Sequence, residues 1–161
     1  MNPKLIAALA VMTMSAPAFA QEGDAAAGER EFNKCKACHM IQDASGTDII
    51  KGGKTGPNLW NIVGSKFAAE EGFKYGPGIT AVAEAHPDAV WDVASLHKYL
   101  ENPTNYVREY AGDEKARSLM TFRMADGAGK DNLVAYLVSV SPDAPAQPTE
   151  SDGAPQAAPA E

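Results

Sequence analysis

The chain has 161 residues, 45% of them hydrophobic, and a formal net charge of −7 at neutral pH. This length accommodates one modest domain once the terminal segments are set aside. The acidic charge excludes nucleic acid as a partner, because a polyanion is repelled by a surface of the same sign.

Residues 1–20 have the pattern of a secretory signal peptide. Lys4 supplies the positive charge, an apolar stretch follows, and the sequence AFA at 18–20 is a small-x-small cleavage site. A transmembrane anchor is the alternative, but the apolar run is too short to cross about 30 Å of hydrocarbon and Pro17 interrupts it. We therefore expect export to the periplasm and cleavage before Gln21, which can then cyclise to pyrrolidone carboxylic acid.

The central part of the chain predicts an all-α domain. Residues 24–39 are rich in helix formers, and Asp24 is placed to cap them. Residues 93–101 predict a second helix that ends before Pro103. Residues 130–140 predict a third, because apolar side chains recur there at i, i+3, i+4 and i+7. We find no convincing pair of strands.

A long irregular region, residues 40–87, separates the first two helices and holds most of the glycines of the domain. Loops of this length in a compact domain are usually functional and often wrap a ligand. Three short helices joined by such loops make a thin core, which a large flat apolar group would fill better than side chains alone.

Residues 141–161 are rich in proline and alanine, acidic, and without aromatic side chains. Such a segment cannot bury enough apolar surface to offset the entropy of ordering it, so we expect a disordered tail. The tail holds four acids and the signal peptide holds one base, which leaves the domain at 21–140 with a net charge of about −4.

The sequence CKACH at 35–39 contains both cysteines of the chain and one of its three histidines. Two thiols at i and i+3 lie on one side of a helical turn, which suits a disulfide oxidoreductase, half of a zinc site, or the covalent attachment of a haem. An exported protein often carries structural disulfides, but none can form here without consuming this pair. The cysteines are therefore predicted to serve chemistry rather than cross-linking.

The surroundings of this motif favour haem attachment. A thioredoxin-like site requires a βαβ pattern, which the sequence around the motif does not have. A zinc site requires four ligands, but His86 and His97 are distant from the motif in the chain and are expected at the surface. CxxCH is the attachment signature of c-type haem, in which Cys35 and Cys38 add to the porphyrin vinyl groups and His39 lies under the iron. We therefore predict one covalently bound haem.

The other side of the iron needs a ligand or stays open. Three of the six methionines belong to the signal peptide, and Met40 follows His39 too closely to reach the opposite side. Met120 and Met124 remain as candidates, although a methionine more often fills gaps in a core.

These motifs resemble those of class I cytochromes c, most closely the larger bacterial cytochromes of the c2 and c550 type, which are related to mitochondrial cytochrome c. The resemblance covers residues 23–140 and rests on the sequences GEREFNKCKACHMI, KGGKTGPNLWNIVG, EEGFKYG, VWDVASLHKYLENP, SLMTFRM and DNLVAYLVSV. It implies the cytochrome c fold, with short helices and long loops wrapped around one haem. It also implies that Met120, followed closely by Phe122, is the thioether ligand and that Met124 is a core residue.

The resemblance implies further roles for individual residues. Pro57 matches the residue whose carbonyl accepts the outer N–H of His39, a bond that would fix the imidazole and raise its basicity. Tyr75 and Trp91 match the pair that hydrogen-bond a haem propionate, and Tyr99 matches the hydroxyl near the thioether sulfur. Plain core packing is the alternative contribution of these aromatic residues.

The contact between the first and last helices is implied for four residues: Gly28, Phe32, Leu133 and Tyr136. Two positions depart from the family pattern. Ser65 lies where an arginine often stands near the buried propionate, and Leu119 lies where many relatives have a docking lysine. Neither departure touches the iron ligands.

With both axial positions filled, the iron would have no open site for a substrate, which predicts an electron carrier without catalytic residues. We also expect the protein to be a monomer. The resemblance implies a cytochrome bc1-type donor and, as acceptor, a terminal oxidase or photosynthetic reaction centre. It places a basic ring for docking these complexes around the haem edge, although scattered surface bases are the alternative. The ring residues are Arg30, Lys34, Lys54, Arg117 and Arg123.

Two other functions remain open from the sequence. The first is a haem enzyme, or a gas or peroxide sensor, in which the distal methionine is labile. The second is a thiol oxidoreductase in which both cysteines are free.

Overall fold

The computed structural model describes residues 23–125 and 127–145; the predicted signal peptide, Gln21 and the rest of the predicted tail lie outside these ranges. The described chain forms five α-helices, one 3-10 turn and a two-stranded sheet: α1 (Ala25–Glu31), η1 (Phe32–Lys34), β1 (Ile41–Gln42), β2 (Asp48–Ile50), α2 (Pro77–Ala85), α3 (Val93–Glu101), α4 (Pro103–Ala111) and α5 (Ala128–Ser139). This content confirms the all-α prediction. Among the described residues, no helix has the length and apolar character needed to cross a bilayer.

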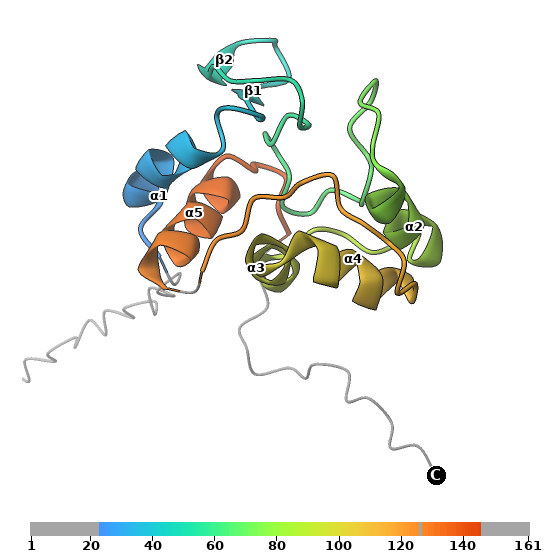
Figure 1. Ribbon diagram of the computed structural model, residues 1–161. Helices are drawn as coiled ribbons and strands as arrows, with labels where there is room; N and C mark the ends of the chain where they lie inside the picture. The colour runs from blue at the N-terminus through green and yellow to red at the C-terminus, as the bar shows by residue number, and fades with distance from the viewer. Residues whose placement is uncertain (1–22, 126, 146–161) are drawn as a thin grey trace, which may run out of the picture.

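The helices form two groups (Figure 1). α1 and α5 lie side by side and make the most extensive helix–helix contact, while α2 and α3 both pack against α4. α3 also contacts α5 and so joins the two groups. The segment 112–125 runs between the groups as an extended loop, and the β1–β2 hairpin projects at one end of the molecule (Figure 1).

α1 begins where the sequence predicts but ends earlier. The Asp24 carboxylate accepts hydrogen bonds from the N–H groups of Ala26 and Ala27, at 2.8 and 3.1 Å, and so caps the helix. The chain then tightens into η1 and a turn in which the N–H groups of Cys35 and Lys36 both donate to the Phe32 carbonyl, at 2.8 and 3.2 Å. The Lys36 carbonyl accepts a hydrogen bond from Gly53 at 2.9 Å. The predicted helix over 24–39 is therefore too long.

The predicted crossing of the first and last helices is confirmed. Gly28 is buried in α1, and the rings of Phe32 and Tyr136 meet edge to face with centroids 5.9 Å apart. Leu133 is buried beside them in the core. Because Gly28 has no side chain, the two helix backbones approach more closely here than any larger residue would allow.

α3 has the predicted bounds, and α5 begins two residues earlier than predicted. A reciprocal capping box starts α3, since the Asp92 carboxylate accepts from the Ser95 N–H and the Ser95 hydroxyl accepts from the Asp92 N–H. The prediction of a solvent-exposed His97 is wrong. Its Nδ1 lies 3.7 Å from the Asp131 carboxylate of α5, so the side chain is held between the two helices.

Two helices, α2 and α4, are not predicted from the sequence, and both begin with a proline. Pro103 follows the end of the predicted helix at 93–101, as expected, but it also occupies the first turn of α4, where a residue without an N–H is tolerated. Asn102 serves both helices: it ends α3, and its side chain accepts a hydrogen bond from the Asn105 N–H at 3.1 Å. His86 follows α2 and is exposed as expected.

The expectation that no strands pair is also wrong. β1 and β2 form an antiparallel pair in which Ile41 faces Ile50. The turn between them is closed by the Asp43 carboxylate, which accepts from the N–H groups of Ser45 and Thr47 at 2.9 Å each. Strands of two and three residues are too short to give an alternating pattern in the sequence.

Residues 141–145, which the sequence places in the tail, pack against the domain. The buried Ser141 hydroxyl accepts from the Val63 N–H at 3.1 Å, and Asn61 exchanges two hydrogen bonds with Asp143. Pro145 lies over Gly64. Residues 141–145 therefore belong to the domain rather than to the predicted tail.

We expect Gly28→Ala to destabilise the protein by about 1–3 kcal/mol, the usual cost of overpacking. A Cβ at this position would lie 1.9 Å from the Asn132 carbonyl oxygen and 2.7 Å from the Tyr136 Cβ, so the two helices must separate. Urea denaturation of the purified protein measures the change. Gly129→Ala is the matched control, because its Cβ would come no closer than 3.3 Å to Met124. Equal stability of the two variants would contradict the close helix crossing.

Candidate functional site

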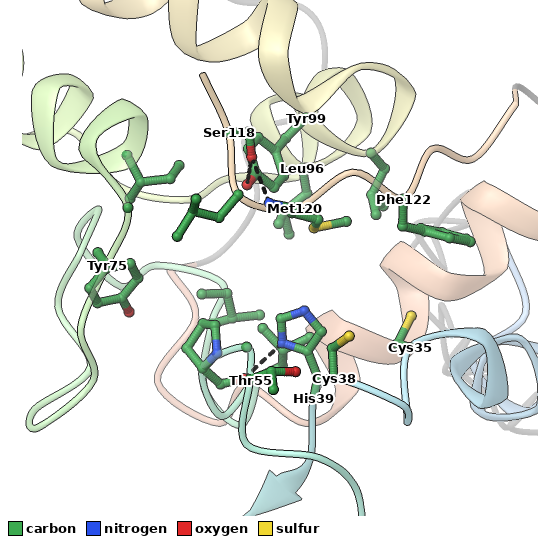
Figure 2. A pocket seen from close by; sticks show the side chains of 18 of the residues that line it. Cys35, Cys38, His39, Thr55, Tyr75, Leu96, Tyr99, Ser118, Met120 and Phe122 are labelled. Carbon is green, nitrogen blue, oxygen red and sulfur yellow. Dashed lines mark hydrogen bonds between the residues drawn. The ribbon is translucent and has the colours of Figure 1, made fainter. Parts of the chain in front are cut away.

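An apolar cavity of about 350 Å³ lies between the two helix groups. Its size falls in the range of ligand and cofactor pockets, and its walls come from loops and helices far apart in the sequence. The structure brings all eight predicted site residues to these walls: Cys35, Cys38, His39, Pro57, Tyr75, Trp91, Tyr99 and Met120. Figure 2 shows the central part of this cavity.

The His39 imidazole is held from behind by the chain around Pro57. Its Nδ1 lies 2.8 Å from the Pro57 carbonyl oxygen, and because a carbonyl only accepts, Nδ1 carries the proton and Nε2 has the free lone pair. Burial lowers the pKa of His39, and the bond to Pro57 partly opposes this shift. The ring is therefore neutral and oriented, as a metal ligand must be.

Gly56 completes this support. A Cβ at position 56 would lie 2.3 Å from the Cε1 atom of His39, so any larger residue would push the ring out of its place. The backbone of the loop thus packs directly against the imidazole, and the glycine in the sequence TGPNL is required by this close approach.

The two cysteines lie on the same side of the cavity as His39 (Figure 2). The turn after η1 places them there, since the N–H groups of Cys38 and His39 both donate to the Cys35 carbonyl, at 3.0 and 2.9 Å. Burial raises the pKa of Cys35 to about 11, which keeps it a neutral thiol. A thiol oxidoreductase needs a lowered pKa at its attacking cysteine, so this environment argues against that alternative.

Met120 lies across the cavity from His39 (Figure 2). Its N–H donates to the Ser118 hydroxyl at 3.1 Å, and that hydroxyl is 2.9 Å from the Tyr99 hydroxyl. Met124 is in a different position: it is buried in the core rather than on the cavity wall, and its N–H donates to the Leu100 carbonyl at 2.8 Å. Only Met120, of the two candidates, faces His39.

The remaining predicted aromatic residues lie around the same cavity. Trp91 is buried, and its backbone exchanges hydrogen bonds with Gly64 and Ser65 on the neighbouring loop. The Tyr75 hydroxyl accepts a hydrogen bond from the Glu70 N–H at 3.2 Å. The ring centroids of Trp91 and Tyr99 are 5.0 Å apart.

The two departures from the family pattern have clear positions. The Ser65 hydroxyl donates to the Ile62 carbonyl at 2.8 Å, so it is engaged within its own loop. Leu119 is 72% exposed and packs beside Gly76 at the edge of the cavity. An apolar side chain therefore lies where the pattern has a charged one.

The five predicted ring residues are exposed, but they are not equivalent. Lys34 lines the cavity and is paired with Glu31, whereas the Arg117 guanidinium donates to carbonyls of its own loop, at 3.1 Å from Ala116. Lys74 was missed: it is exposed and also lines the cavity.

Three further residues of the site were missed from the sequence: Thr55, Gly56 and Ser118. Thr55 and Gly56 lie directly before Pro57, and the close approach of Gly56 to His39 depends on a long-range contact with no local signal. Ser118 has a local signal in the sequence, because a serine hydroxyl often accepts a hydrogen bond from the backbone N–H two residues later, which here is that of Met120.

Comparison with known proteins places the chain among characterised relatives. It is 52% identical to cytochrome c-550 of Paracoccus versutus over 154 residues, which covers 96% of this chain and 99% of the relative. It is 42% identical to cytochrome c2 of Rhodobacter capsulatus over 134 residues, 83% of this chain and 93% of the relative. A scan of family models finds no match.

Solved structures agree with these relatives. Ferric cytochrome c-550 from Paracoccus versutus is similar with a TM-score of 0.72 and 55% identity, covering 75% of this chain and 100% of that one. Cytochrome c2 from Paracoccus denitrificans is similar with a TM-score of 0.73 and 56% identity, covering 76% and 99%.

We expect Ser118→Ala to destabilise the Met120 segment, because it removes the acceptor of the Met120 N–H and the partner of the Tyr99 hydroxyl together. A loss of about 1–3 kcal/mol in unfolding free energy is the usual effect of leaving such groups unpaired. Amide hydrogen exchange at Met120 should become faster. Ser118→Thr keeps the hydroxyl and should restore both values; exchange at Met120 that is the same in all three proteins would refute the role of Ser118.

Proposed function

The chain belongs to the class I cytochromes c, in the group of cytochromes c2 and c-550, and from this premise we propose that it is a periplasmic single-haem electron carrier. Its fold is the cytochrome c fold, and like its relatives it is an electron carrier rather than an enzyme. The finer points of the proposal concern the iron ligands, the partners and the location.

We assign the covalent attachment of the haem to Cys35 and Cys38 and the iron ligands to His39 and Met120. When bound, the haem supplies a one-electron couple at its iron. The residues present fit this group: both thiols and the lone pair of His39 are on one side of the cavity, and a thioether is on the other. Gly56 leaves room for the imidazole that a Cβ would displace.

The observation that carries the proposal is the placement of His39 and Met120 on opposite sides of one apolar cavity (Figure 2). An iron held by both would have no free coordination position, so substrates would reach it only slowly and outer-sphere electron transfer would be its main reaction. Thioether ligation and an apolar surrounding both favour the ferrous state, so the reduction potential should be high.

The visible spectrum of the purified protein, oxidised and reduced, tests this proposal. A covalent haem with the ferric absorbance band of thioether ligation supports it. A haem spectrum without that band would favour the haem enzyme or sensor. A protein that gains no haem mass by mass spectrometry, with two titratable thiols, would favour the thiol oxidoreductase.

The ligand assignment predicts different effects for the two methionines. Met120→Ala should open the iron to added ligands such as imidazole and lower the reduction potential sharply, because the thioether is lost. Met124→Ala is the matched control: it should destabilise the core by about 2–5 kcal/mol and leave the ligand band unchanged. Ligand-binding spectra and redox titration measure both. Exchanged phenotypes would show that the ligand is Met124.

We propose that the partners are membrane redox complexes, with a cytochrome bc1-type donor and an oxidase or photosynthetic reaction centre as acceptor. Two basic residues, Lys34 and Lys74, lie at the cavity edge, although the protein is acidic overall. This separation of charge would steer the edge toward acidic surfaces. We further propose that residues 1–20 direct export, that Gln21 becomes the amino terminus, and that the protein acts as a monomer.

Reversing charge in the predicted ring tests the docking proposal. The double variant Lys34→Glu and Lys54→Glu should react with a membrane oxidase about tenfold or more slowly at low ionic strength, because steering is lost. The effect should disappear at high salt, where charges are screened. Lys66→Glu with Lys98→Glu gives the same change in net charge away from the cavity. Equal rates for both double variants would refute a localised ring.

A further inference from the structure

A connected group of aromatic side chains runs from the cavity into the body of the protein. Trp91 and Tyr99 line the cavity and are in ring contact with each other. Tyr106 contacts both, with centroid distances of 5.8 Å to Trp91 and 5.5 Å to Tyr99. Tyr110 follows one turn later on α4, 4.2 Å from Tyr106. Neither Tyr106 nor Tyr110 lines the cavity.

Three of these rings form a near-parallel stack. The planes of Trp91 and Tyr106 are inclined by 20°, and those of Tyr106 and Tyr110 by 16°. Tyr106 is 3% exposed, whereas Tyr110 is only partly buried, next to the exposed His86 and below the ammonium group of Lys98. The stack therefore joins the cavity wall to the protein surface.

Packing alone does not explain the phenol group of Tyr106. The Tyr106 hydroxyl is buried and makes no hydrogen bond of good geometry within the described chain. The neighbouring Ser95 hydroxyl is already engaged with the backbone of Asp92. A buried polar group without a partner lowers stability, so phenylalanine would be the better residue for packing. Tyrosine and tryptophan differ from phenylalanine in one further respect: they are readily oxidised.

We propose that Trp91, Tyr106 and Tyr110 form a second electron route, which supplies electrons from the protein surface to the haem when a peroxide has oxidised it. The proposal rests on the haem site assigned above. Its function is protective, since an oxidising equivalent that moves to Tyr110 no longer attacks the cofactor or the thioether of Met120.

The electron balance closes with a reductant such as a thiol. Hydrogen peroxide takes two electrons and two protons and becomes two molecules of water. Two electrons reach the haem in single steps through the stack, and each oxidised Tyr110 is restored by one electron and one proton from a thiol. Two thiols thereby become one disulfide.

The environments of the two tyrosines give the route its direction. Tyr110 is partly exposed to solvent, so its phenol can release a proton when it loses an electron. The oxidising equivalent therefore comes to rest on Tyr110. Tyr106 is 3% exposed, and burial raises the pKa of its phenol, so it does not release its proton to solvent and the oxidising equivalent does not remain on it. Tyr106 therefore acts as the contact between Trp91 and Tyr110 rather than as the final donor.

Peroxide treatment of the holoprotein, in the presence of a nitroso spin trap, tests this route. Peptide mass spectrometry should locate the adduct on Tyr110, and the haem absorbance should bleach several-fold faster in Tyr110→Phe than in the unmodified protein. Tyr110→Phe keeps the ring contacts, so its folding, ligand band and reduction potential should not change.

Tyr136→Phe is the matched control, because Tyr136 has a buried hydroxyl but belongs to the α1–α5 contact and not to the stack. It should bleach at the rate of the unmodified protein. Adducts confined to other tyrosines, or equal bleaching of Tyr110→Phe and the unmodified protein, would overturn the route. A colourless protein would instead refute the haem proposal itself, so the two failures are distinguishable.

Discussion

The fixed position of His39 is the constraint on which the rest of the site depends. The Pro57 carbonyl sets which ring nitrogen is protonated, and the backbone of Gly56 sets where the ring can lie. Both belong to a loop that is itself tied back to the CKACH turn, since the N–H groups of Gly53 and Gly56 donate to the carbonyls of Lys36 and Cys38. The attachment motif and its support thus form one unit, so a ligand held there is oriented before it meets anything on the other side of the cavity.

The opposite wall is built on a different principle. Met120 belongs to an extended loop, which has no internal helix or sheet to hold it, so the loop depends on individual anchors. Ser118 links its backbone to Tyr99 of α3, and Met124 links it to the Leu100 carbonyl of the same helix. α3 therefore holds the loop at both ends of the sulfur-bearing segment. Because α3 also packs on α4 and α5, the distance between the two walls is set by the helix core and not by the loop.

The sequence predicted the features that have local signals. The CxxCH spacing, the helix at residues 93–101 and the Asp24 cap each depend on neighbours in the chain, and the structure has the helix and the cap as expected. The resemblance to class I cytochromes c also predicted site residues without a local signal, such as Pro57 and Tyr75, which reach the cavity through long-range contacts.

What the sequence missed depends on such contacts or on ambiguous signals. α4 was missed because Pro103 can either end one helix or begin the next, and only the side-chain cap from Asn102 decides between them. The hairpin was too short for periodicity. The position of His97 depends on Asp131, which belongs to a different helix, so the pattern of residues 93–101 alone does not indicate it.

The two proposed electron routes place different demands on one fold. Transfer to a partner needs the haem to be reachable from the surface, which the cavity edge at Lys34, Lys74 and Leu119 provides. An exposed apolar residue such as Leu119 can make close contact with a partner without the cost of desolvating a charge. The same open edge would admit small oxidants, and the proposed ligation by His39 and Met120 would slow their reaction without abolishing it. A stack that leaves the cavity through α4 would separate these two events, because oxidative damage would then end at Tyr110 and not at the docking edge.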